Sequence, residues 1–236
     1  MANFLTDKSL EGEARFGGWA LARRVFAEPG AEPNYAPDRG YRLDHIALAL
    51  EIDPVARTLR GTATIRLSSL PGQDGWYVLD FDEVEVDSVT TPDGAAHPWR
   101  HADGKLSVAP TSAVVVRWHG SPRRGLWFVG PTAAEPNREP EAWTQCQDED
   151  GHFMFPCFDH PSVKHPWTIE VVAPAGYGVV SNGRLVARDG TRWRWEQVEP
   201  MPAYLVTVVV QKMDVHETSW DGIPVRYTVP AGTPSA

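Results

Sequence analysis

Apolar and polar residues alternate along many short segments of the chain from residue 41 onward. Between residues 59 and 68, one side of the pattern is occupied by Leu59, Gly61, Ala63, Ile65 and Leu67, and the other by arginine, threonine and serine. A period of two predicts a half-buried β-strand. Strands are predicted over residues 41–51, 58–67, 76–81, 84–89, 113–119, 167–172, 192–197, 203–212 and 224–229.

Turn signals separate these segments and support an all-β fold. They are Pro71-Gly72, Pro92-Asp93-Gly94, Asp103-Gly104, Asn182-Gly183, Asp189-Gly190 and Asp221-Gly222. Many short strands with regular turns, and no convincing helix among them, predict a β-sandwich or a similar fold of several sheets. Residues 1–40 lack this pattern, and their one amphipathic stretch, residues 14–26, is followed by several prolines and glycines. We interpret them as an N-terminal extension packed on the domain.

Charge and hydropathy narrow the class of protein. The chain has 31 acidic and 22 basic residues, a formal net charge of −9, so neither nucleic acid nor an anionic membrane is an expected partner. No apolar run reaches the roughly 18 residues of a membrane-spanning helix, and the first residues lack the pattern of a signal peptide. The expectation is a cytoplasmic, soluble protein.

Two kinds of residue invite a binding site but have a simpler explanation. Cys146 and Cys157 are the only cysteines, and a structural zinc site usually uses two closely spaced pairs, so buried, reduced thiols are expected. Trp193 and Trp195 alternate with arginines and should share one face of a strand. They could form an aromatic platform for a ligand, but burial against a facing sheet is the commoner use.

One long segment, residues 143–164, differs from the rest of the chain. It mixes polar and aromatic residues and lacks alternation through its centre. Such irregular segments, held on a rigid scaffold, are where functional contacts concentrate. It contains Thr144-Gln145-Cys146-Gln147 and then Phe155-Pro156-Cys157-Phe158-Asp159-His160-Pro161-Ser162-Val163-Lys164.

These two motifs resemble the signature of the aminopeptidase N and leukotriene hydrolase superfamily of zinc peptidases. Val180-Ser181-Asn182-Gly183 is similar to the family's Ser-Asn-Gly turn, and Met201-Pro202-Ala203-Tyr204-Leu205-Val206 to its Met-Ser-x-Tyr-Leu strand. The opening segments around residues 41–45 and 61–65 also resemble the family's first strands. The resemblance covers about residues 41–229, with its motifs in the family's order.

The resemblance implies a saddle-like, multi-sheet β-sandwich domain with antiparallel and mixed strands over residues 41–230. In the family a catalytic domain follows, with zinc held by His-Glu-x-x-His. None of the eight histidines here forms that motif, and His97 and His101, four apart, are separated by Pro98-Trp99-Arg100. We therefore expect residues 231–236 to begin a linker to an absent catalytic domain, no metal in this chain, and zinc only in the full-length enzyme.

The family resemblance also assigns candidate site residues. It implies that Gln145 and Gln147 project into the active-site cleft, where the second position holds the substrate's free α-amine. A glutamine can accept a hydrogen bond from that ammonium but lacks the charge of the glutamate often found there. The alternative is that both amides bind the backbone of their own loop. Asp159 and Lys164 could form a catalytic ion pair, but a structural brace is preferred, and the acidic run at 148–150 is expected to be solvated.

The resulting hypothesis is a substrate-anchoring N-terminal domain of a zinc aminopeptidase, inactive alone. Its expected partners are the N-terminus of a peptide substrate and the catalytic domain of the same polypeptide. Whether this chain is itself an enzyme is left open. The alternative is a separate β-sandwich module that binds protein or carbohydrate. An exposed apolar patch beside Gln145 and Gln147 would favour the first hypothesis, because monomers rarely expose large apolar patches.

Overall fold

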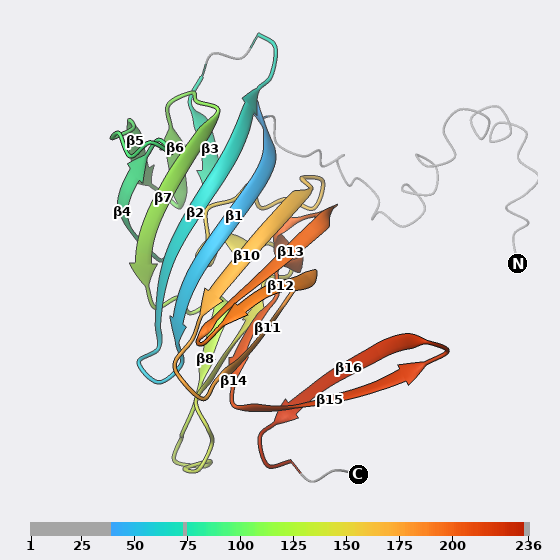
Figure 1. The fold of residues 1–236 in the computed structure, drawn as a ribbon. Helices are drawn as coiled ribbons and strands as arrows, with labels where there is room; N and C mark the ends of the chain where they lie inside the picture. The colour runs from blue at the N-terminus through green and yellow to red at the C-terminus, as the bar shows by residue number, and fades with distance from the viewer. Residues whose placement is uncertain (1–38, 73–74, 234–236) are drawn as a thin grey trace, which may run out of the picture. The chain divides into compact units, whose positions relative to one another are not determined.

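The largest sheet has seven strands and carries most of the alternating segments (Figure 1). In the computed structural model, which describes residues 39–72 and 75–233, its order is β12-β13-β10-β1-β2-β7-β4. The strands are β1 (Tyr41–Asp53), β2 (Thr58–Ser69), β4 (Glu85–Thr90), β7 (Ala113–Gly120), β10 (His165–Val172), β12 (Arg184–Asp189) and β13 (Arg192–Met201). The sheet is mixed, because β1 pairs with β10 in parallel while the other neighbours are antiparallel.

Two smaller antiparallel sheets and a hairpin complete the fold (Figure 1). The four-stranded sheet has the order β11-β14-β9-β8, with β8 (Gly125–Val129), β9 (Glu141–Gln145), β11 (Gly178–Ser181) and β14 (Val208–Gln211). The three-stranded sheet has the order β3-β6-β5, with β3 (Tyr77–Asp80), β5 (Trp99–Ala102) and β6 (Lys105–Val108). Strands β15 (Met213–Trp220) and β16 (Ile223–Pro230) form the hairpin.

One apolar core receives side chains from the inner faces of all three sheets. Ile46 and Leu48 enter it from β1, Leu79 from β3 and Val208 from β14, each at most 1% exposed. Gly61 shows how closely the layers pack, since a Cβ there would lie 2.0 Å from the Trp118 ring. The absence of a side chain at residue 61 is therefore what lets this indole lie across β2.

The all-β, multi-sheet prediction is confirmed, as is the burial of Trp193 and Trp195, which are 4% and 5% exposed. The single strand expected over residues 203–212 is wrong: a 3₁₀ turn, Ala203–Leu205, comes first and β14 starts only at Val208. The Met201–Val206 motif therefore forms the end of β13 and this turn. Strands β5, β6, β8, β9, β11, β12 and β15 were not predicted.

The extension predicted over residues 1–40 lies, up to residue 38, outside the described residues. Within the part that is described, no helix is long and apolar enough to cross a membrane. The described strands run from Tyr41 to Pro230. The domain boundary at residue 230 and the linker after it remain predictions.

Candidate functional site

Strand β9 places Gln145 on the outer face of the four-stranded sheet. Alternation turns Ala142 into the core, where it is 0% exposed, and leaves Trp143 and Gln145 on the opposite face. The Thr144 hydroxyl, on the inner side, accepts a hydrogen bond from Val208 N–H at 2.9 Å and donates one to the Val206 carbonyl at 3.3 Å. The end of β9 is thus tied to the beginning of β14, which fixes the direction of Gln145.

Gln147 lies in a tight turn directly after β9. The turn is closed by Asp150 N–H, which donates to the Cys146 carbonyl at 2.8 Å, and the Gln147–Asp148 peptide is cis. The buried Cys146 thiol faces the Gly125 carbonyl at 3.7 Å. Gly125 adopts φ +71°, and a Cβ there would lie 2.3 Å from the Asp150 carbonyl oxygen. The turn therefore packs directly on the start of β8.

The side chains of both glutamines are available to a ligand. Both residues are exposed, and neither amide has a hydrogen-bond partner among residues 39–72 and 75–233. The alternative in which they bind the backbone of their own loop thus has no contact in its favour. Their role in a substrate cleft remains a prediction.

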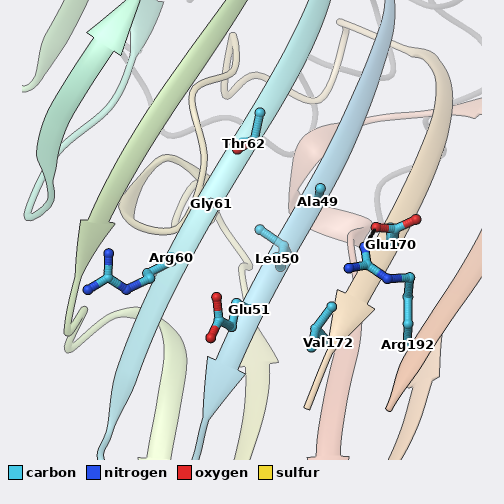
Figure 2. Close-up of a pocket in the computed structure, with 9 residues that line it drawn as sticks. All are labelled: Ala49, Leu50, Glu51, Arg60, Gly61, Thr62, Glu170, Val172 and Arg192. Atoms are coloured by element: carbon cyan, nitrogen blue, oxygen red, sulfur yellow. Dashed lines mark hydrogen bonds and ion pairs between the residues drawn. The ribbon is translucent and has the colours of Figure 1, made fainter. Parts of the chain in front are cut away.

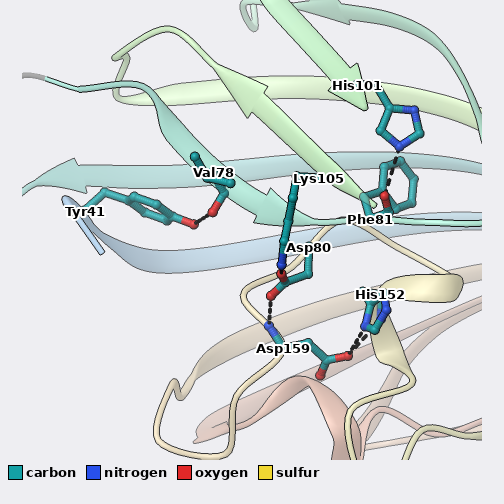
Figure 3. A network of polar contacts seen from close by, with 8 residues as sticks. All are labelled: Tyr41, Val78, Asp80, Phe81, His101, Lys105, His152 and Asp159. Carbon is teal, nitrogen blue, oxygen red and sulfur yellow. Dashed lines mark hydrogen bonds and ion pairs between the residues drawn. The ribbon is translucent and has the colours of Figure 1, made fainter. Parts of the chain in front are cut away.

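The rest of the irregular segment is fastened to β3 by a polar network (Figure 3). Asp159, with its side chain 3% exposed, accepts hydrogen bonds from His152 N–H and His152 Nδ1, each at 3.0 Å. Asp159 N–H donates to Asp80 Oδ2 at 2.8 Å, and Asp80 pairs with Lys105. Backbone bonds join Asp80 to Cys157 in both directions. This arrangement is a structural brace, as preferred from the sequence.

Lys164 does not form the alternative ion pair with Asp159, and most of the acidic run at 148–150 is exposed to solvent. Lys164 is exposed and contacts no carboxylate within the described ranges, so it does not pair with Asp159. Asp148 and Glu149 are exposed, as expected for a solvated acidic run, while Asp150 is half-buried and holds the turn. The acidic run therefore contributes charge near Gln147 and one structural hydrogen bond.

Burial and neighbouring charges shift the pKa values of three side chains in this segment. Burial raises the pKa of the Cys146 thiol to about 12, and burial and nearby carboxylates raise the pKa of Cys157 well above its usual value. Burial alone would lower the pKa of His152, but its hydrogen bond to Asp159 and the charges of Asp159 and Asp80 leave that pKa raised. The thiols are thus protonated and unsuited to metal binding or nucleophilic attack.

Zinc does not fit the residues of this domain. Among the described residues no three histidine, cysteine, aspartate or glutamate side chains are grouped to hold a metal ion. His97 and His101 face different carbonyls, those of Ala109 and Phe81, each at 2.9 Å. Their ring nitrogens are therefore engaged separately.

The sequence did not reveal a row of apolar side chains beside Gln145. Trp143 lies opposite Trp127 on β8, with stacked rings 6.3 Å apart, and opposite Val209 on β14. Val209 in turn pairs with Val180 on β11. Trp127 is 41% and Trp143 36% exposed. The exposed apolar surface that would favour the anchoring hypothesis is therefore present on the same face as Gln145.

Two hollows on the surface lie away from Gln145 and Gln147. A groove of about 730 Å³ separates the hairpin from β11 and β13 and is lined by Tyr177, Trp193, Met213, Val215 and neighbouring residues. A smaller hollow of about 190 Å³ lies on the outer face of the seven-stranded sheet (Figure 2). There Glu170 already pairs with Arg192 above a floor of small residues. Its charged rim is typical of a solvated sheet face.

Comparison with known proteins identifies the domain that carries this segment. Residues 131–205, which include β9, the turn and the His152 and Asp159 part of the brace, match the model of the Peptidase M1 N-terminal domain. Residues 131–205 belong to an M1 peptidase N-terminal domain. Leucine aminopeptidase 2-1 of Meyerozyma guilliermondii is 37% identical to the chain over 83 residues, 35% of this chain and 13% of that relative.

Longer alignments extend the similarity over most of the chain. Leucine aminopeptidase 2-2 of Scheffersomyces stipitis is 23% identical over 199 residues, covering 79% of this chain and 31% of the relative. The structure of native yeast LTA4 hydrolase superposes with a TM-score of 0.68 at 21% identity, covering 84% of this chain and 33% of that one. An M1 zinc metallopeptidase from Deinococcus radiodurans gives 0.65 at 20% identity, covering 84% and 50%. The chain thus spans a third to a half of the solved relatives and less than a third of these curated ones.

Proposed function

We propose that this M1 domain anchors the N-terminus of peptide substrates for a zinc-dependent aminopeptidase, and that it has no peptidase activity alone. The observation that carries the proposal is the pair of exposed, unengaged amides of Gln145 and Gln147 at the end of β9. They lie in the segment that matches the family model, and several relatives are leucine aminopeptidases.

The chemistry of the amides suits an α-ammonium group. Each glutamine carbonyl oxygen can accept a hydrogen bond from N–H, and the turn and brace limit the movement of Gln147. A neutral amide lacks the charge attraction of a carboxylate, so the anchor holds the ammonium by a hydrogen bond alone. Loss of that hydrogen bond should mainly weaken substrate binding.

Zinc and the catalytic groups are proposed for polypeptide beyond this chain, because the described residues offer no suitable ligand set. The M1 relatives include zinc metallopeptidases. A cytoplasmic location remains a prediction from the sequence, as do the domain boundaries at residues 40 and 230. Fractionation of cells that express the tagged full-length protein would test the location.

The test is a kinetic comparison in the product of the complete reading frame. Gln147→Ala should raise KM for aminoacyl substrates roughly tenfold, the loss of one hydrogen bond to a charged group, with a smaller change in kcat. Gln147→Glu should lower KM because it adds charge attraction. Gln197→Ala, which removes a glutamine whose amide already donates to the Glu199 carbonyl, serves as the control.

A second measurement tests recognition of the substrate's α-amine separately from the rest of the peptide. Inhibition by a dipeptide analogue should be compared with inhibition by the same analogue without its α-amine. Gln147→Ala should reduce the preference for the free amine. An unchanged preference in both Gln145→Ala and Gln147→Ala, or a full-length protein without aminopeptidase activity, would reject the proposal and favour a separate binding module.

A further inference from the structure

The four-stranded sheet is apolar on both faces at its centre. On the inner face, Ala142 of β9 and Val210 of β14 are fully buried in the core. On the outer face, pairing across the sheet joins Val180, Val209, Trp143 and Trp127 into one row. With strands about 4.8 Å apart, this row crosses the sheet over roughly 14 Å.

An antiparallel sheet with one solvated face normally alternates apolar and polar residues. Strand β14 does not, since Val208, Val209 and Val210 follow one another. Such continuous apolar runs are typical of strands buried on both faces. The described residues cover the inner face only, because Trp127 and Trp143 remain 41% and 36% exposed. The centre of this sheet therefore has the apolar composition of an inner layer.

Polar residues border the row, as they border the centre of a protein interface. On one side lie Gln145 and Thr207, and on the other Glu141 and Gln211, each two residues from the row along its own strand or chain segment. Aromatic residues at the centre with a polar rim are the usual anatomy of an interface, and tryptophan is enriched among the residues that dominate binding energy.

We propose that this row, formed by Val180, Val209, Trp143 and Trp127, is the surface on which the remaining polypeptide of an M1 peptidase packs. The proposal rests on the proposed function and names the contact that function needs. The occupant follows from the comparisons: the matched model describes an N-terminal domain, and the chain accounts for only about a third of yeast LTA4 hydrolase. In such relatives a larger part of the polypeptide accompanies the domain.

Packing there would place the glutamines at the edge of the contact. Gln145 follows Trp143 by two residues on the same face, a separation of about 7 Å along a strand. Gln147 continues in the turn beyond it. The row would thus hold the domain in position while the amides face the space next to the joined parts, where a peptide end can enter.

The test is oxidative footprinting of tryptophans by mass spectrometry, comparing the 236-residue chain with the product of the complete reading frame. Trp127 and Trp143 should be oxidised readily in the shorter chain and be protected several-fold in the longer one. Trp76 and Trp99, with matched exposures of 40% and 36%, provide internal controls and should react equally in both proteins.

Each other outcome overturns the proposal. Equal oxidation of Trp127 and Trp143 in both proteins would mean that the row stays uncovered. Protection already in the shorter chain would show that the row is covered by its own residues, or by a second copy if the protection depends on concentration. Protection of all four tryptophans would show that the protection is not specific to this face. A reading frame that ends at Ala236 would mean that there is no further polypeptide to pack on the row.

A variant separates this proposal from the anchoring function. The double substitution Trp127→Ser and Trp143→Ser should lower the melting temperature of the full-length protein by several degrees more than that of the 236-residue chain, which loses mainly the contact between the two stacked rings. Equal losses in the two proteins would contradict packing at this row. Footprinting requires no peptidase activity, so protection without a KM effect of Gln147→Ala would reject the anchoring role and keep the docking surface.

Discussion

At the scale of single residues, His165 should make the domain sensitive to acid. Burial is the main cause that lowers the pKa of His165 to about 4, and the nearby positive charges of His45 and Arg39 act in the same direction. In the unfolded chain the imidazole has a pKa of about 6.5. Between these values only the unfolded state binds the proton, so stability falls as the pH falls, by about 3 kcal/mol once the pH is below 4.

Replacement of His165 by glutamine should therefore flatten the dependence of the free energy of unfolding on pH between about 6.5 and 4. His152 provides a control of opposite sign. Its pKa is raised in the fold, so its contribution is present below the unfolded pKa and is lost as the pH rises through the folded one. His152→Gln should remove the gain in stability that accompanies a fall in pH from above the folded pKa to about 6.5, and leave the slope between 6.5 and 4 unchanged. Urea denaturation at a series of pH values measures both, and equal slopes in all three proteins would contradict the assignment.

Single residues were predicted well where alternation decides their environment and poorly where pairing does. Arg192, Trp193, Arg194 and Trp195 alternate as the sequence predicted, with both indoles buried. Gln145 and Gln147 became candidates only through a motif, because nothing in the period distinguishes them from loop residues. The contact of Trp143 with Trp127 depends on register between β8 and β9. Register is set by tertiary pairing, which a single sequence does not display.

At the scale of elements, the failed strand over residues 203–212 has a local cause. Side chains replace the ladder there: Asn182 donates to the Leu205 carbonyl at 3.0 Å and accepts from Thr207 N–H. Thr144 bonds the backbone on both sides of Thr207, at Val206 and Val208. The apolar run continues through the interruption because Ala203 and Val206 are buried in the 3₁₀ turn and the residue after it. Apolar periodicity reports burial and does not identify the hydrogen-bond partner.

The junction between β8 and the turn that holds Gln147 should depend on Gly125. Gly125→Ala introduces a Cβ 2.3 Å from a backbone oxygen of Asp150 as well as the cost of φ +71° for a residue with a side chain. Since backbone must shift, we expect a loss of roughly 2–4 kcal/mol in the free energy of unfolding, from strain and overpacking together.

The matched control is Gly222→Ala in the hairpin turn. Gly222 has φ +75°, but no atom lies within 4 Å of its added Cβ, so only the conformational cost of about 1 kcal/mol remains. Chemical denaturation of both variants separates the contact from the backbone conformation. Equal losses would show that the turn does not pack on Gly125 as described.

At the scale of the whole molecule, the sequence predicted the fold class but not which strands become neighbours. The centre of the largest sheet is the parallel pair β1 and β10, which joins Ile46 with Trp167 across more than a hundred residues. No turn connects these strands, so no turn signal predicts their pairing. The resemblance to a known family placed the opening strands and the irregular segment in one domain, but it did not predict which strands pair.

The β15–β16 hairpin should tolerate polar substitutions on its exposed apolar face. Alternation puts Trp220, Ile223, Val225 and Tyr227 on one face, with exposures of 77%, 62%, 40% and 53%. Because little of these side chains is buried in the folded chain, Trp220→Ser combined with Ile223→Thr should change the free energy of unfolding by only about 0.5 kcal/mol. Trp195→Ser, at 5% exposure, should cost about 3–5 kcal/mol.

The same double substitution should reduce self-association of the 236-residue chain, since an exposed apolar face on a hairpin with unpaired edges favours contact between copies. Sedimentation velocity over a range of concentrations measures this, with denaturation of the same samples as the check on folding. A loss of stability comparable to that of Trp195→Ser would show that another segment of the chain covers this face. If both association and stability are unchanged, the hairpin is not the surface through which copies associate. The row that contains Trp127 and Trp143 would then be the next surface to substitute.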